Sequence, residues 1–99
     1  MLSDAGTPPT MTQPEIIDRI RGYVTENFLY MRQGVEFADT DSLLGRGIID
    51  SMGIGELVVF VQDEFAILVD DGEITEENFG TVESIGQFVF GKREAHLAA

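Results

Sequence analysis

The fold of this chain is decided by residues 43–65, LLGRGIIDSMGIGELVVFVQDEF. The first part of this stretch contains Gly45 and Gly47, and glycines at such spacing favour turns. In the second part, apolar residues recur at the spacing of one helix face: Ile54, Leu57, Val58, Val61 and Phe65. Such a stripe is typical of a helix that packs on a core. The stretch therefore predicts a loop that turns into a helix over about 51–66.

A capping motif begins a second helical pattern nearer the N-terminus. Thr12, followed three residues later by Glu15, forms a capping box. Apolar residues then recur at helical spacing: Ile16, Ile17, Ile20, Val24, Phe28 and Met31. We therefore expect a helix over roughly 13–31. The segment over 33–50 has no sustained period, yet it contains apolar residues, which predicts a long loop packed on the core.

Two further helices are expected after the deciding stretch. Thr75 is placed to cap a short helix that ends at Gly80. Thr81 is placed to cap a last helix, which Gly91 is expected to stop. Three main helices, one short helix and one long first loop predict an all-α fold, a small four-helix bundle. We expect a flexible leader over 1–11, one domain over 12–91 and a frayed tail over 92–99.

Composition and charge limit the classes of function. The chain has 99 residues, of which 43% are apolar, and a formal charge of −12. This charge repels nucleic acid and anionic membranes and favours basic protein surfaces. The chain has no cysteine, and its single histidine, His96, lies in the predicted tail, so we predict that it is not an enzyme. Because no stretch approaches the ~20 apolar residues that span a bilayer and no secretory signal is evident, we expect a cytoplasmic monomer.

Ser51 is the residue of greatest chemical interest. It stands where the loop turns into the helix, and the commonest role of a serine there is a plain N-cap. Its hydroxyl would also lie at the positive end of the helix dipole, where a phosphate ester is favoured. From position alone, both roles remain open.

The deciding stretch resembles the acyl and peptidyl carrier protein family. The hallmark of that family is a Gly-x-Asp-Ser-Leu-like turn at the head of the second helix, and Asp50-Ser51-Met52 takes the place of Asp-Ser-Leu here. Glu56-Leu57-Val58 and Asp63-Glu64-Phe65 also resemble the family pattern. The resemblance covers about 12–90 and implies a four-helix carrier-protein bundle.

The resemblance also implies a covalent cofactor. A phosphopantetheinyl transferase would attach 4′-phosphopantetheine to Ser51, and Asp50 would help that enzyme and its metal to recognise the site. The arm would carry an acyl or aminoacyl group as a thioester, and its thiol would be the only one in a chain without cysteine. A loading ligase or synthetase and a downstream transferase would be the other partners.

A docking patch is expected beside the arm. Its members lie on the flank of the second helix or ring that flank with negative charge: Met52, Gly55, Val59, Glu56, Asp63 and Glu64. Isolated apolar residues on a surface are ordinary, so the patch gains its meaning from the carrier resemblance. Charge there would mainly set the rate and orientation of encounter with basic partners.

Three positions depart from the family pattern. Met52 replaces the usual leucine, which is a mild change of similar volume. Gly53 and Gly55 stand where housekeeping fatty-acid carriers tend to have an acidic residue and a valine. Each glycine costs roughly 1 kcal/mol relative to alanine in a helix, and together they are expected to flatten the docking patch. The two glycine departures favour a dedicated carrier over one for central fatty-acid synthesis.

Two questions stay open from the sequence. The first is whether the chain is instead an acidic helical adaptor that binds a basic partner without a prosthetic group. The second is the cargo of a carrier, because a fatty acyl chain, a polyketide and a single amino acid all remain compatible with the residues present.

Overall fold

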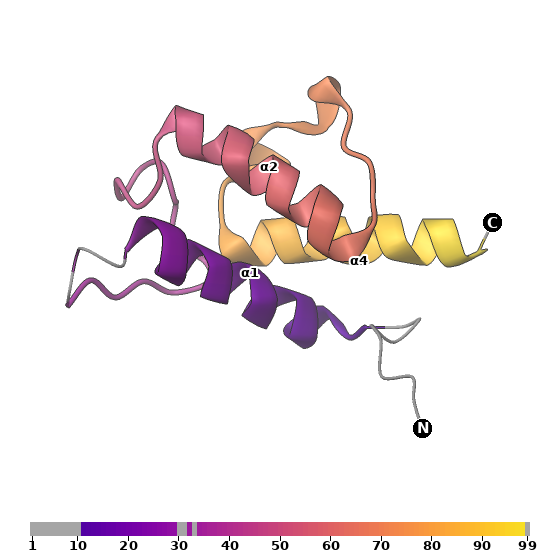
Figure 1. The fold of residues 1–99 in the computed structure, drawn as a ribbon, viewed down its shortest axis with the longest axis horizontal. Coiled ribbons are helices and arrows are strands. Elements are labelled where there is room, and N and C mark those ends of the chain that lie inside the picture. Colours follow the sequence, from indigo (N-terminus) through magenta and orange to yellow (C-terminus); the bar gives the residue numbers. More distant parts are fainter. Residues whose placement is uncertain (1–10, 30–31, 33, 99) are drawn as a thin grey trace.

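The computed structural model describes residues 11–29, 32 and 34–98, and within these residues the fold is all-helical with no strand. The elements, in chain order, are α1 (Gln13–Phe28), α2 (Ser51–Phe65), the 3-10 helix η1 (Asp71–Glu73), α3 (Glu76–Phe79) and α4 (Val82–Ala98). The predicted all-α bundle of three main helices and one short one is confirmed. Figure 1 shows that the start of α2 lies at the opposite end of the molecule from the start of α1 and the end of α4.

The predicted capping box begins α1. The Glu15 backbone N–H donates to Thr12 Oγ1 at 3.2 Å, and the Thr12 backbone N–H donates to Glu15 Oε1 at 2.8 Å. The helix ends at Phe28 rather than near residue 31, because Leu29 leaves the helical conformation and turns into the core. Met31, the last residue of the predicted stripe, lies outside the described residues.

One core lies between the three long helices. Its most deeply buried side chains on these helices are Ile16, Ile20, Val24, Leu57, Val61, Phe65, Val82, Ile85 and Val89. α1 and α4 approach each other closely at Gly86, where a Cβ would stand only 2.4 Å from Ile17 Cγ1. A side chain at position 86 would therefore push the two helices apart.

The long first loop is packed on this core, as predicted. Leu43, Ile48 and Ile49 are buried, and the backbone N–H groups of Ile48 and Ile49 both donate to the Leu43 carbonyl. Leu43 in turn donates its N–H to the carbonyl of Gly80 at 2.9 Å, which ties the loop to the end of α3. Gly47 has a φ of 69°, a conformation that glycine adopts at no steric cost. These contacts therefore hold the part of the loop that leads into α2.

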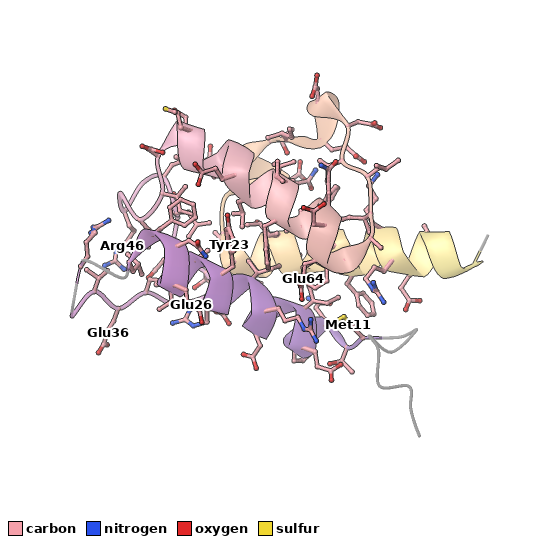
Figure 2. All side chains as sticks on the ribbon, in the orientation of Figure 1. Met11, Tyr23, Glu26, Glu36, Arg46 and Glu64 are labelled. Atoms are coloured by element: carbon pink, nitrogen blue, oxygen red, sulfur yellow. The ribbon has the colours of Figure 1, made fainter. Side chains whose placement is uncertain are left out.

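Two further predicted boundaries differ from the structure. Gly91 does not stop the last helix, because α4 continues to Ala98. Lys92 pairs with Glu73 at 2.9 Å, and Arg93 donates to the Phe65 carbonyl at 2.8 Å, so the start of the predicted tail is tied to the bundle. Met11, assigned to the leader, is 6% exposed and belongs to the core (Figure 2). The rest of the predicted leader, 1–10, lies outside the described residues.

In the part of the chain that the structure describes, no helix is long and apolar enough to cross a membrane.

Candidate functional site

The turn into α2 is capped by Asp50 and not by Ser51. Asp50 has an extended backbone, and its Oδ1 accepts the backbone N–H of Gly53 at 2.8 Å. Ser51 is the first residue inside the helix, and it is exposed. Of the two roles that position alone left open for Ser51, the structure excludes the plain N-cap, because the preceding carboxylate takes that role. Among the described residues, the Ser51 hydroxyl has no hydrogen-bond partner.

The backbone around Ser51 is also open to an anion. The first N–H groups of any helix have no partner within the helix. The Gly53 N–H is used by the Asp50 cap, and the Ile54 N–H donates to the Asp50 carbonyl at 3.1 Å. The N–H groups of Ser51 and Met52 have no acceptor within the described residues. Negative charge on a group attached to Ser51 would therefore meet two unused donors and the positive end of the dipole.

Most of the predicted docking patch is exposed on α2. The Met52 side chain is 80% exposed and the Val59 side chain is 55% exposed, and Gly55 lies between them on the same face. Glu56 and Asp63 are exposed as well. The structure thus brings these five residues and Ser51 to one accessible side of the helix.

Glu64, the sixth predicted member, faces a different neighbour. It forms an ion pair with Arg19 of α1, and Figure 2 shows Glu64 between α2 and α1. Its side chain is 34% exposed and is engaged within the molecule. Because its partner is 45 residues away in the chain, sequence spacing on α2 did not reveal this role. Glu64 is therefore better assigned to the seam between α1 and α2 than to the docking patch.

The same seam contains an aromatic stack. The rings of Tyr23 in α1 and Phe60 in α2 lie with their centroids 4.0 Å apart and nearly parallel (Tyr23 is labelled in Figure 2). Partial burial, with a smaller contribution from the charge of Glu56, raises the pKa of the Tyr23 phenol. The seam thus fixes α2 against α1 and leaves the opposite side of α2 exposed.

Gly53 does not belong to the exposed face. It is buried, and a Cβ there would stand 2.5 Å from Ile49 Cγ2 and 2.8 Å from Phe28 Cε1. The expectation that both glycines flatten the docking patch is therefore wrong for Gly53. Gly55 alone has that effect, because a Cβ there would have no neighbour within 4 Å.

A small apolar cavity beside the first turn of α2 was not predicted. Its volume is about 130 Å³, and its lining includes Leu44, Ile54, Ile74 and Phe79. Leu44 and Ile74 are 48% and 38% exposed at its edge. Three separate segments form this cavity, so no periodic pattern in one segment predicts it. The available signal was the presence of Leu44 and Ile74 outside any helical stripe.

A larger hollow of about 690 Å³ lies between α1 and the first loop, and its lining includes Arg21, Arg32 and Phe37. Arg21 already donates to Asp39 at 3.0 Å and to the Phe37 carbonyl at 2.7 Å, and its guanidinium lies over the Phe37 ring. Arg32 donates to the Gly47 carbonyl at 2.8 Å. These arginines hold the loop in place, and neither Ser51 nor the docking patch lines this hollow.

Comparison with known proteins adds no assignment. No protein-family model matches the chain, and no curated protein matches it. The case for a function therefore depends on the geometry around Ser51.

Proposed function

We propose that this chain is a carrier protein that is modified with 4′-phosphopantetheine on Ser51. One observation carries the proposal: the Ser51 hydroxyl is exposed at the first position of α2, while Asp50 performs the capping role that serine often has. A capping serine has its oxygen engaged with a backbone N–H. A serine relieved of that task presents a free hydroxyl at a helix N-terminus, where a phosphodiester is favoured.

The modification uses the Ser51 hydroxyl as nucleophile. The Ser51 Oγ forms a bond to the phosphorus that bears the pantetheine arm of coenzyme A, and the pyrophosphate P–O bond breaks. Adenosine 3′,5′-bisphosphate leaves with that electron pair, and the hydroxyl proton passes to a base of the phosphopantetheinyl transferase. The carrier chain supplies the hydroxyl, the two unused N–H groups and the helix dipole.

The arm supplies a terminal thiol, which the cysteine-free chain does not have, for carrying an acyl or aminoacyl group as a thioester. The exposed face of α2 would meet a loading ligase or synthetase and a downstream transferase. The glycine departures, of which Gly55 lies on the exposed face, favour a dedicated carrier. We further propose that this carrier acts in the cytoplasm as a monomer. Fatty acyl, polyketide and aminoacyl cargo all remain within the proposal.

Incubation with coenzyme A, magnesium and a broad-specificity phosphopantetheinyl transferase tests the proposal. We expect intact-mass spectrometry to show the addition of one phosphopantetheine, which peptide mapping assigns to position 51. Ser51→Ala removes the nucleophile and should abolish the addition. Ser42→Ala is the matched control, because Ser42 is a loop serine that accepts the Gly45 N–H, and its loss should leave the addition intact. A wild-type chain that stays unmodified contradicts the proposal.

The exposed patch also favours a second candidate. Met52 and Val59 form an apolar surface beside Glu56 and Asp63, which suits an acidic adaptor that binds a basic partner without any arm. In that case Ser51→Ala leaves partner binding and cellular function intact. Complementation of a deletion strain by Ser51→Ala distinguishes the two, since a carrier variant without its nucleophile fails.

A further inference from the structure

The small apolar cavity beside the first turn of α2 has a buried floor and an exposed apolar rim. Its volume is about 130 Å³, and its apolar walls are Leu44 of the first loop, Ile54 of α2, and Ile74 and Phe79 of the segment 74–80. Phe79 is buried, whereas Leu44 and Ile74 are half-exposed at the opening. We call this space the Ile54 cavity. Its opening presents apolar surface to a group that lies against this side of α2.

The cavity exists because the segment 74–80 is attached to elements other than α2. Phe79 packs on Phe88 of α4, with ring centroids 5.4 Å apart, and the Gly80 carbonyl accepts the N–H of Leu43. Within the described residues, no hydrogen bond or ion pair joins the segment 74–80 to α2. The two walls therefore face each other across a gap that apolar side chains line.

Ser51 lies next to one wall of this cavity. Ser51 and Ile54 are three residues apart in α2, so their Cβ atoms are neighbours, about 5–6 Å apart on the helix surface. The Cα–Cβ bonds of a helix tilt toward its N-terminus, which directs the Ile54 side chain back toward the turn that contains Ser51. A group attached to the Ser51 hydroxyl therefore comes within reach of the cavity with its first few atoms.

We propose that the Ile54 cavity holds the two methyl groups that branch from the phosphopantetheine arm directly beyond its phosphate. This inference rests on the proposed carrier function. In the arm, the phosphate ester oxygen is followed by a methylene and then by a quaternary carbon that bears both methyl groups. These methyl groups are the most apolar part of the arm and the part nearest to Ser51 after the phosphate. The thiol lies at the far end of the arm.

The volume of the cavity fits this branched group. An apolar cavity of roughly 150 Å³ stays dry and binds a molecule as large as benzene. The Ile54 cavity is slightly smaller and has the same kind of lining, so a quaternary carbon with two methyl groups can enter it. A long fatty acyl chain has far more carbon atoms than benzene and does not fit this space. The cavity therefore suits the arm better than a long cargo.

The polar atoms of the lining suit the next part of the arm. Ser42 and Thr75 also line the cavity. Each hydroxyl oxygen accepts a backbone N–H, from Gly45 and Asn78 respectively, and neither O–H has an acceptor within the described residues. A hydroxyl can donate and accept at the same time. Beyond its methyl groups the arm carries a hydroxyl and an amide carbonyl, which can accept these protons. The thiol and its cargo stay outside the cavity.

NMR of the loaded protein tests the inference. A broad-specificity phosphopantetheinyl transferase attaches an arm whose two branching methyl groups are labelled with ¹³C, and intact-mass spectrometry verifies complete loading. With the thiol free, we expect nuclear Overhauser effects from these methyl groups to the side chains of Leu44, Ile54 and Ile74. A folded, fully loaded protein without these effects overturns the inference.

An arm that lacks the two methyl groups, attached from the corresponding coenzyme A analogue, provides a second readout. The protein with the normal arm should have a Tm about 2–5 °C higher than the protein with the analogue, because its methyl groups leave water for the apolar cavity. Both arms carry the same phosphate, so the charge at Ser51 is equal in the two proteins. Equal Tm values would overturn the inference.

Variants at the rim assign the effect to the cavity. Ile74→Phe fills the opening with a larger ring, and Ile74→Asn makes one wall polar. In each variant, the Tm difference between the two arms and the contacts with Ile54 should disappear. Leu68→Phe and Leu68→Asn are the matched controls, because Leu68 is an exposed loop leucine that does not line the cavity. Both should keep the Tm difference, and its equal loss in the controls counts against the cavity.

The outcomes separate this inference from the proposed function. A wild-type chain that accepts no arm overturns both. A loaded chain whose arm methyl groups stay in solvent overturns the inference and leaves the carrier function standing. Contacts with the cavity that come only from an acyl group on the thiol also overturn it, because the cavity then belongs to the cargo.

Discussion

Phe28, the last residue of α1, lies against Gly53 in the first turn of α2, so closely that a Cβ at position 53 would stand 2.8 Å from Phe28 Cε1. This contact sets how near the first turn of α2 approaches α1. It lies two residues beyond Ser51, so the position of the candidate attachment site depends on it.

Gly53→Ala is therefore expected to destabilise the protein, although alanine is the better helix former. The added methyl group would meet both Phe28 and Ile49, and overpacking of this kind typically costs about 1–3 kcal/mol. Urea denaturation measures the change in the free energy of unfolding, with Gly55→Ala as the matched control of opposite sign. Equal stabilisation by both alanines would show that the first turn of α2 has more room than the Phe28 contact allows.

Asp50 is expected to have two separable roles. Asp50→Ala removes the acceptor of the Gly53 N–H and should cost about 1 kcal/mol of stability, whereas Asp50→Asn keeps an acceptor and should change stability little. If the carboxylate also helps the transferase to recognise the site, Asp50→Asn lowers the kcat/KM for loading while the Tm stays near that of the wild type. Denaturation and loading kinetics on the same samples check both roles. Wild-type loading of Asp50→Asn would leave Asp50 as a cap alone.

We expect the exposed acidic residues of α2 to affect loading, and the one that is paired with α1 to affect stability. Glu56→Gln and Asp63→Asn remove exposed charges of the docking patch, so we expect a few-fold lower kcat/KM for loading at low salt and a smaller difference at high salt. Glu64→Gln instead breaks the Arg19 ion pair, which should cost at most about 1 kcal/mol of stability and leave loading unchanged. The three variants are compared at two ionic strengths. An effect of Glu64→Gln on loading as large as that of Glu56→Gln would contradict this division.

Acid should weaken the protein through three surface carboxylates. A backbone N–H, from Thr12, Ala38 and Asp70 respectively, is the main cause that lowers the pKa of Glu15, Asp41 and Glu73. A carboxyl with a lowered pKa in the folded state stabilises the fold above its unfolded pKa. That stabilisation disappears as the pH falls through the folded pKa, because the unfolded chain then binds more protons.

Glu15→Gln isolates this effect for one capping box. The free energy of unfolding of the wild type minus that of Glu15→Gln should be largest near neutral pH and shrink below pH 4.5, the ordinary value for glutamate. Comparison of the two proteins at each pH cancels the titration of the other carboxylates, which both proteins share. A difference that grows in acid would contradict the role of Glu15 as an ionised acceptor.

Features that depend on neighbouring residues in the chain were predictable from the sequence. Thr12 with Glu15 begins α1, and Thr75 caps α3 through the Asn78 N–H, both as expected from local spacing. The core stripe of α2 was also predictable, because helical periodicity records which side faces the core. The exposure of Met52 and Val59 followed from the same periodicity.

Features that depend on the folded backbone or on distant segments were not predictable. Asp50 and Ser51 are both good capping residues, and only the extended backbone at Asp50 decides between them. Glu64 was assigned to the surface because its partner, Arg19, is on another helix. Gly91 was expected to end α4, yet a glycine ends a helix only where the backbone turns away. Lys92 and Arg93 instead tie the next turn to the bundle.

The central claim is that the free hydroxyl of Ser51 carries a phosphopantetheine arm. Intact-mass spectrometry of the protein isolated from its native cell tests this most directly, because it detects the arm together with any cargo. We expect a mass increase of one phosphopantetheine, with or without an acyl or aminoacyl group, located on Ser51 and absent from Ser51→Ala. A native protein with an unmodified Ser51 under all growth conditions would contradict the account.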